Sequence, residues 1–253
     1  MVSSEATTAR PAGTDRDGLV LFLEGAYPDL DREFSAIYRG SVEYTASSVE
    51  RMYALYQAIM YLNARRVAGD IVECGVWRGG NCLLAARTLM LLGDNTRRIW
   101  LYDTFSGMTD PTSRDRDVYG GKALDMRERA HTEEGRPTPF QFVASLDDVK
   151  ANMATTGFPE DRLVYVEGPV EQTLPERRPD EVGLLRLDTD WFESTAHSLR
   201  HLYPQLSRGG VLISDDYGDW PGVREAVDGY LAEVDERLLL NRIDNTGRIA
   251  VKG

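Results

Sequence analysis

The stretch VECGVWRGGN, residues 72–81, decides the fold. Its first residues belong to DIVECG, residues 70–75, which has the pattern of a strand. Gly75 permits a tight turn, and Gly79 and Gly80 permit close backbone approach where the helical pattern of residues 79–93 begins. Strand, glycine-rich turn and helix in this order are typical of the first unit of an open α/β sheet.

Strand and helix patterns continue to alternate after this unit. Helical patterns follow at residues 145–157, 193–206 and 220–235, and the last two strand patterns flank the turn DNTG. We therefore predict a Rossmann-like fold with a seven-stranded, mostly parallel sheet, helices on both faces and a C-terminal antiparallel hairpin. The expected strands lie at residues 70–75, 98–103, 162–168, 182–188, 210–215, 237–243 and 248–252.

The composition fits one large domain and argues against several classes of function. The chain has 253 residues, of which 42% are hydrophobic, and a formal net charge of -12. Because nucleic acids attract clustered Lys and Arg, this charge argues against a nucleic-acid partner. No apolar run is long enough for a membrane span, and the N-terminus lacks the apolar core of a secretory signal. The two cysteines, Cys74 and Cys82, form no disulfide framework, so we expect a reducing, cytoplasmic setting.

Three segments are expected along the chain. Residues 1–18 form a flexible tail, residues 19–68 a helical cap on the substrate side, and residues 69–253 the domain that contains the sheet. Residues 104–140 are polar and long for a loop in a compact domain. We interpret them as a lid that is mobile in the empty protein and closes over bound ligands.

Carboxylates stand at the ends of four predicted parallel strands. These residues are Glu73, Asp103, Asp188 and Asp215. Because ligands of such sheets bind at the carboxyl ends of the strands, we expect the four side chains to converge on one crevice.

The first two of these acids indicate a nucleoside ligand. The glycine pattern is neither GxGxxG nor a Walker motif, and alone it fits an ordinary turn. Asp103, however, ends the second strand, where a carboxylate can accept hydrogen bonds from both ribose hydroxyls. A pyrophosphate is disfavoured beside Glu73 and a turn filled by Trp77 and Arg78. A nucleoside with a cationic substituent suits Glu73 better, and S-adenosylmethionine is such a molecule.

Four motifs in order carry a resemblance to a known family. ECGVWRGG, DTFSGM, LRLDTD and SDDY are similar to motifs of the macrocin O-methyltransferase (TylF) family, over about residues 69–253. These are metal-dependent class I methyltransferases that modify deoxysugars and phenols on antibiotic scaffolds. The resemblance implies that residues 69–253 are an S-adenosylmethionine-dependent methyltransferase domain and that the enzyme is a homo-oligomer. It implies cofactor contacts at Glu73, Gly75, Val76, Gly79, Asp103, Ser106 and Gly168.

The later carboxylates indicate a divalent cation. Asp188 ends the fourth strand, and Asp215 and Asp216 end the fifth. Strands lie about 4.8 Å apart, so acids at adjacent ends can share one ion. All-oxygen ligands favour Mg²⁺, with Ca²⁺ or Mn²⁺ as alternatives. Asp190 and Asp219 either support these ligands or are surface acids.

A zinc site is a weaker interpretation. Glu193, His197 and His201 are spaced four apart on one predicted helix, but the HExxH order is missing. The third histidine, His131, lies in the predicted lid.

The hypothesis is therefore methyl transfer from S-adenosylmethionine to a sugar hydroxyl of a small-molecule glycoside, with a rhamnose-type deoxysugar as the first candidate. The cation would lower the pKa of the hydroxyl, and Asp188 is the candidate general base. Three alternatives stay open: a phenol or catechol acceptor, a nicotinamide-dependent dehydrogenase, and a catalytically silent cofactor-binding partner.

Overall fold

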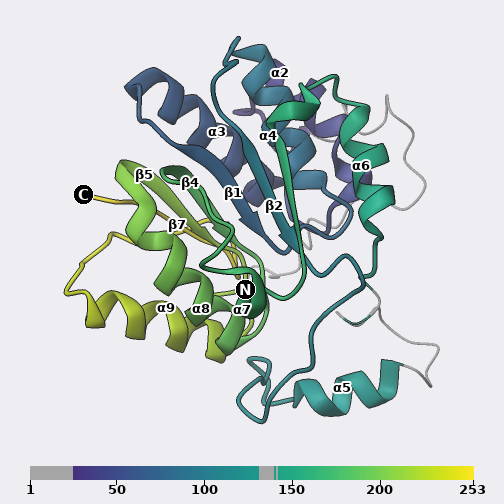
Figure 1. The fold of residues 1–253 in the computed structure, drawn as a ribbon, viewed down its shortest axis with the longest axis vertical. Coiled ribbons are helices and arrows are strands. Elements are labelled where there is room, and N and C mark those ends of the chain that lie inside the picture. The colour runs from purple at the N-terminus through teal and green to yellow at the C-terminus, as the bar shows by residue number, and fades with distance from the viewer. Residues whose placement is uncertain (1–24, 131–139, 141) are drawn as a thin grey trace, which may run out of the picture.

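A seven-stranded mixed sheet forms the centre of the molecule (Figure 1). The computed structural model describes residues 25–130, 140 and 142–253. The strand order is β3-β2-β1-β4-β5-β7-β6, with β1 to β5 parallel and β7 antiparallel to both neighbours. The strands are β1 (Asp70–Cys74), β2 (Ile99–Asp103), β3 (Leu163–Glu167), β4 (Val182–Leu187), β5 (Leu206–Ser214), β6 (Asn241–Arg242) and β7 (Arg248–Val251). The predicted fold class and the C-terminal hairpin are confirmed.

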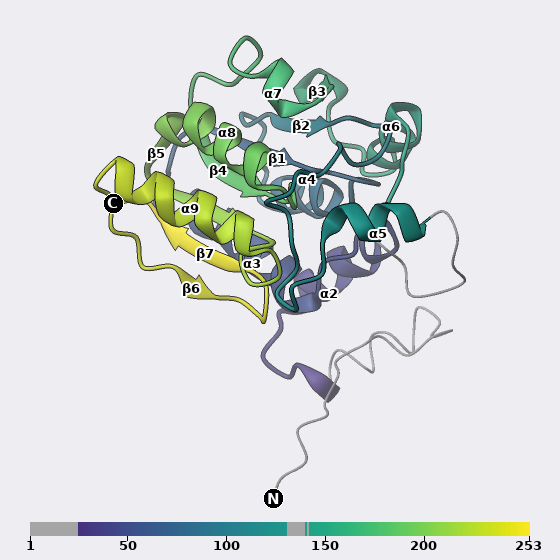
Figure 2. The same ribbon diagram turned by 90° about the horizontal axis from the view of Figure 1, so that it is seen from below.

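Helices cover both faces of the sheet, as Figures 1 and 2 show from two directions. One apolar cluster joins the sheet to α2 (Arg32–Arg39), α3 (Val49–Arg65), α4 (Gly80–Leu91) and α6 (Leu146–Ala154). The other joins it to α7 (Val170–Thr173), α8 (Phe192–Leu202) and α9 (Pro221–Glu233). Alternate residues of each strand point into the two clusters, which explains why the central strands are apolar almost throughout.

Local features of the sequence explain where two helices begin. Ser145 and Asp148 form a reciprocal capping box at the start of α6, and Pro221 stands in the first turn of α9. Within the described ranges, no helix is both long and apolar enough to cross a membrane.

Helix α3, in the segment predicted as a cap, packs on the sheet. It contacts α4, β4 and β5 and supplies Met52, Leu55 and Ile59 to the core. Ser48 caps its first turn by accepting a hydrogen bond from the Arg51 amide. The start of α3 therefore lies firmly at the carboxyl edge of the sheet. The predicted tail, residues 1–18, lies outside the described residues.

The predicted lid contains a helix of its own, α5 (Ala123–Ala130), which lies away from the sheet (Figure 1). Before α5, Asp115 is buried and accepts hydrogen bonds from the amides of Thr112 and Phe192. This contact fastens the first part of the lid to the start of α8. Residues 131–139, with His131, lie outside the described residues, and lid closure stays a prediction.

Candidate active site

One cavity opens at the carboxyl ends of β1, β2, β4 and β5. Most of the predicted site residues line it, which brings the candidate cofactor and metal groups together. These residues are Gly75, Val76, Asp103, Gly168, Asp188, Asp215 and Asp216. Glu73, Gly79 and Ser106, which were also predicted as cofactor contacts, do not belong to its lining.

Gly75 lets the ends of β1 and β4 come close together. Its φ is +84°, and a Cβ atom added there would lie 1.8 Å from the Asp188 carbonyl oxygen. The Asp188 amide donates to the carbonyl of Cys74 at 2.9 Å. Any larger side chain at position 75 would therefore displace Asp188.

Asp103 shapes the glycine-rich turn as well as the cavity. Its Oδ2 accepts hydrogen bonds from the amides of Val76 at 2.8 Å and Trp77 at 3.0 Å. Its Oδ1 accepts from the Phe105 amide at 2.8 Å. The carboxylate is thus fixed by three backbone donors, and its remaining lone pairs can accept from ribose hydroxyls.

Glu73 lies behind the cavity wall. Its Oε1 accepts from Arg186 Nη1 at 2.5 Å and from Asn81 Nδ2 at 3.2 Å, and its Oε2 accepts from Cys82 Sγ at 2.8 Å. Burial raises the pKa of this carboxyl, and the charge of Arg186 opposes the effect. Asn81 lines the cavity, whereas its hydrogen-bond partner Glu73 does not.

Three carboxylates meet in the same cavity. Asp188, Asp215 and Asp216, the acid cluster, each offer an oxygen within 4.8 Å of the others. Among the residues that the structure describes, no other acidic, His or Cys group has this geometry. The donors of the acid cluster are all oxygen, which suits Mg²⁺, Mn²⁺ or Ca²⁺.

Burial and neighbouring charges raise the pKa of two acids at this site. Burial, followed by the charges of Asp188 and Asp215, raises the pKa of Asp190 to about 8. Burial and the neighbouring Asp190 and Asp188 also raise the pKa of Asp216. Asp216 Oδ2 accepts a hydrogen bond from the Asp190 amide at 3.1 Å, and this donor is neutral. A bound divalent cation would supply the missing positive charge.

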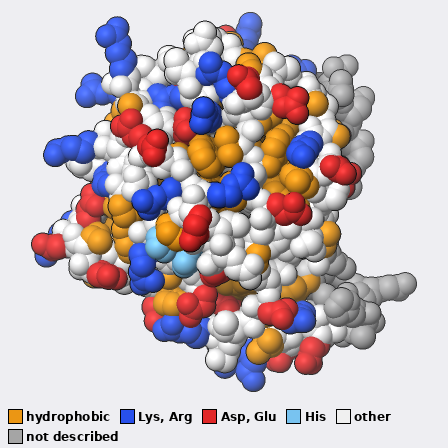
Figure 3. Space-filling model, in the orientation of Figure 1, with side chains coloured by type: hydrophobic (Ala, Val, Ile, Leu, Met, Phe, Trp, Pro, Cys, Tyr) orange, Lys and Arg blue, Asp and Glu red, His pale blue; other side chains and the backbone are white. Residues whose placement is uncertain are grey.

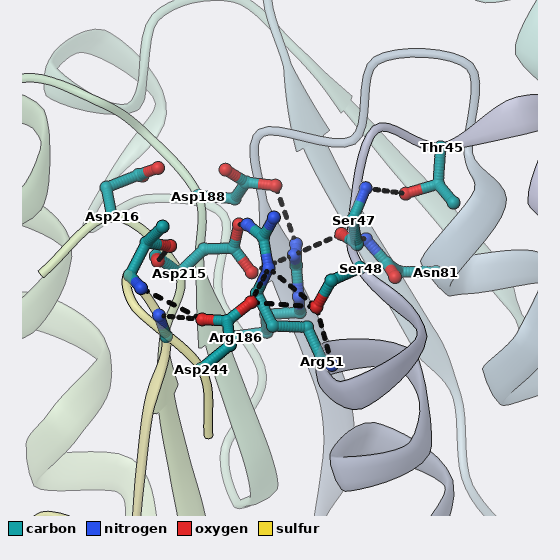
Figure 4. A network of polar contacts seen from close by, with 12 residues as sticks. Thr45, Ser47, Ser48, Arg51, Asn81, Arg186, Asp188, Asp215, Asp216 and Asp244 are labelled. Atoms are coloured by element: carbon teal, nitrogen blue, oxygen red, sulfur yellow. Dashed lines mark hydrogen bonds and ion pairs between the residues drawn. The ribbon is translucent and has the colours of Figure 1, made fainter. Parts of the chain in front are cut away.

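Two arginines contact the acid cluster, and neither is among the residues predicted from the sequence (Figure 4). Arg186 on β4 bonds Glu73, Asp188 and Asp215. Arg51 on α3 bonds Asp215 and Asp244. The signal for Arg186 was available, because an arginine inside an apolar strand needs buried acidic partners.

Two cavity residues other than glycine have left-handed backbone conformations. The φ angles of Trp77 and Asp190 are +47° and +57°, which non-glycine residues rarely adopt. Such strain gathers at functional sites. Trp77, Phe142 and Trp191 give the cavity an aromatic lining on which a ring-containing acceptor can stack.

The zinc interpretation finds no support in the geometry. His197 and His201 contact each other, with ring centroids 4.5 Å apart, and His197 Nε2 contacts the Leu174 carbonyl. Glu193 is largely exposed and lies 3.9 Å from Arg114.

On the face in Figure 3, basic side chains are scattered among acidic ones rather than gathered in one area.

Comparison with known proteins agrees on one family. The model of the macrocin-O-methyltransferase (TylF) family matches residues 24–251. The chain is 32% identical to the 8-demethyl-8-(2,3-dimethoxy-alpha-L-rhamnosyl)-tetracenomycin-C 4'-O-methyltransferase of Streptomyces olivaceus, over 89% of this chain and 82% of that protein. It is 30% identical to the mycinamicin III 3''-O-methyltransferase of Micromonospora griseorubida, over 83% of this chain and 78% of that protein. The solved structure of the O-methyltransferase NovP superposes with a TM-score of 0.71 at 29% identity, covering 94% of this chain and 97% of that one.

Proposed function

Since this chain belongs to the macrocin O-methyltransferase (TylF) family, we propose that it methylates a sugar hydroxyl on a glycosylated natural product. The observation that carries this proposal is the meeting of Asp103 and the acid cluster on one cavity. A relative's name includes a dimethoxy-rhamnosyl group, so a rhamnose-type deoxysugar is the proposed acceptor. The family favours this reaction over a nicotinamide-dependent one.

S-adenosylmethionine is the proposed methyl donor, and it supplies an electrophilic methyl group on a sulfonium. In this chain, Asp103 would accept hydrogen bonds from the ribose hydroxyls, beside the backbone of Gly75, Val76 and Gly168. We propose that Glu73 acts indirectly, because it orients Asn81 on the cavity wall. Gly79 and Ser106 would act through the shape of the turn and loop that carry them.

The acid cluster is the proposed site of a divalent cation, Mg²⁺ first. When bound, the cation would lower the pKa of the acceptor hydroxyl and fix its orientation. Asp188 suits the role of general base, because its side chain is 28% exposed whereas that of Asp215 is 3% exposed. Arg186 Nη1 holds Asp188 Oδ2 at 2.8 Å, so Oδ1 is the atom that would receive the hydroxyl proton.

The test is product analysis by mass spectrometry. The enzyme is incubated with S-adenosylmethionine and rhamnosylated natural products, with Mg²⁺ or with EDTA. We expect a single methylation of the sugar that needs Mg²⁺. Methylation of the aglycone phenol instead would replace the sugar acceptor by the phenol alternative. Calorimetry should show binding of S-adenosylhomocysteine and none of NAD.

Two further proposals concern setting and assembly. We propose a reducing, cytoplasmic setting, because Cys74 and Cys82 are both free and buried. We propose a homo-oligomer from the family resemblance, and light scattering of the purified protein tests this.

A further inference from the structure

The two arginines at the acid cluster are held in different ways. The Arg186 side chain is 2% exposed and bonds Glu73, Asp188 and Asp215. The Arg51 side chain is 15% exposed and lines the cavity. Arg186 is therefore a fixed part of the sheet, whereas Arg51 reaches the acid cluster from α3, through the side of the cavity.

Asp215 is the residue where the two arginines meet. Its Oδ1 accepts from Arg186 Nη2, and its Oδ2 accepts from Arg51 Nη1 (Figure 4). Both carboxylate oxygens are thus engaged by guanidinium groups. A divalent cation bound to Asp215 would stand next to the charge of Arg51, and like charges at this separation repel strongly in a buried site.

Asp244 offers Arg51 a second partner outside the acid cluster. Arg51 Nε lies 3.0 Å from Asp244 Oδ2. Asp244 itself is fixed, because it accepts hydrogen bonds from Ser48 Oγ at 2.7 Å and from the Gly247 amide at 2.7 Å. The guanidinium can therefore leave Asp215 and remain paired.

We propose that Arg51 is an internal cation that occupies Asp215 when no metal is bound and that an entering divalent cation displaces toward Asp244. The inference rests on the metal site of the proposed function. Arg51 keeps Asp215 paired in the metal-free protein and lowers metal affinity. Because Arg51 lines the cavity together with Thr45 and Ser47, its displacement also changes the cavity wall.

Direct titration of the full-length protein with Mn²⁺, followed by electron paramagnetic resonance without cofactor or acceptor, tests this proposal. Arg51→Gln should bind Mn²⁺ at least about tenfold more tightly than the wild type, because one competing charge is gone. Arg51→Lys keeps the charge and should stay close to the wild type. Asp244→Asn should bind Mn²⁺ more weakly, because Arg51 then depends on Asp215 alone. Arg65→Gln, an exposed position on the same helix, is the control and should leave affinity unchanged.

The outcomes separate this inference from the proposed metal site. An Arg51→Gln variant that binds Mn²⁺ equally or more weakly would overturn the displacement and leave the site in place. If neither the wild type nor any variant binds Mn²⁺, the displacement of Arg51 and the proposed metal site are both overturned. If Arg51→Gln does not fold, the Asp244→Asn and Arg51→Lys titrations decide, because tighter binding by Asp244→Asn contradicts the proposal.

Discussion

Arg186 and Glu73 occupy paired positions on β4 and β1, and Arg186 Nη1 lies 2.5 Å from Glu73 Oε1. Both side chains are almost fully buried in the centre of the sheet. The same guanidinium bonds Asp188 and Asp215, so it joins β1 to the acid cluster. Buried ion pairs cost much desolvation energy, so we infer that this network serves orientation more than net stability.

Removing Arg186 should be strongly destabilising. Arg186→Met leaves Glu73 and Asp215 buried without their common partner, and we expect a loss of about 3–5 kcal/mol in the free energy of unfolding. Urea unfolding of the metal-free protein measures it. Arg200→Met, at an exposed position of α8, should change stability by less than about 0.5 kcal/mol.

A double variant shows whether the buried pair itself is responsible. Adding Glu73→Gln to Arg186→Met removes one of the uncompensated charges and should recover part of the stability. Additive losses in the double variant would contradict the pairing as the cause.

The fold and the convergence of the acids could be predicted because they follow from local and general rules. Apolar runs that alternate with helical patterns specify a parallel sheet, and parallel strands bring their carboxyl ends to one edge. Asp103, Asp188 and Asp215 end three of those strands, and the structure places all three on one cavity. The sequence predicts a turn at Gly75, and the close approach of the Asp188 carbonyl explains why this position needs a glycine.

The partners of the acids could not be predicted, because they depend on tertiary packing. Glu73 was interpreted as a residue that faces the cofactor, yet its position opposite Arg186 depends on the register of β1 with β4. Arg51 is one of many charged residues on a helix, and only the packing of α3 on β5 brings it to Asp215. Glu73 and Arg186 are charged residues inside apolar strands, and this is a sequence signal that they need partners. No comparable signal marks Arg51.

The metal-free protein should lose stability as the pH rises. The pKa of Asp190 is raised to about 8 in the folded state, mainly by burial, so its stabilising contribution is complete below the unfolded value of about 3.9 and is lost as the pH rises through about 8. The raised pKa of Asp216 acts in the same direction. In EDTA, the free energy of unfolding should fall across this window by up to about 1.4 kcal/mol per pH unit for each group.

Denaturant unfolding at several pH values measures this dependence, with EDTA and with excess Mg²⁺. Mg²⁺ should reduce the fall, because it compensates the ionised acids. Asp190→Asn removes one titrating group, and Asn tolerates the left-handed φ of +57° at this position. The same slope for the wild type and Asp190→Asn would show that Asp190 does not titrate in this window.

Asp103 should contribute to cofactor affinity through the ribose. Asp103→Ala is expected to weaken S-adenosylhomocysteine binding by about 1.5–3 kcal/mol, the range for hydrogen bonds to a charged group. Because Asp103 also holds the Val76 and Trp77 amides, the variant alone cannot separate ribose binding from a displaced turn. Calorimetry with a 2′-deoxy analogue does so: the analogue should bind the wild type more weakly and Asp103→Ala no more weakly than the parent ligand. Glu167→Ala, at the paired position of β3, is the control.

Asp188 should matter more for turnover than Asp216 does, because only Asp188 is proposed to take the proton. Asp215 is unsuitable for the comparison, since it also holds Arg51 and Arg186. Asp188→Asn keeps an oxygen donor and the size of the side chain but removes its basicity, and turnover at saturating Mg²⁺ should fall by about 10²–10⁴-fold. Asp216→Asn should act through metal affinity, so excess Mg²⁺ ought to restore most of its activity. Binding of S-adenosylhomocysteine to both variants is the control, because the cofactor is proposed to bind through Asp103 and the backbone beside it. Full rescue of Asp188→Asn by Mg²⁺ would show that the cation activates the hydroxyl without this base. Equal losses that Mg²⁺ does not rescue would move the search for the base to Asp190, which lines the same cavity.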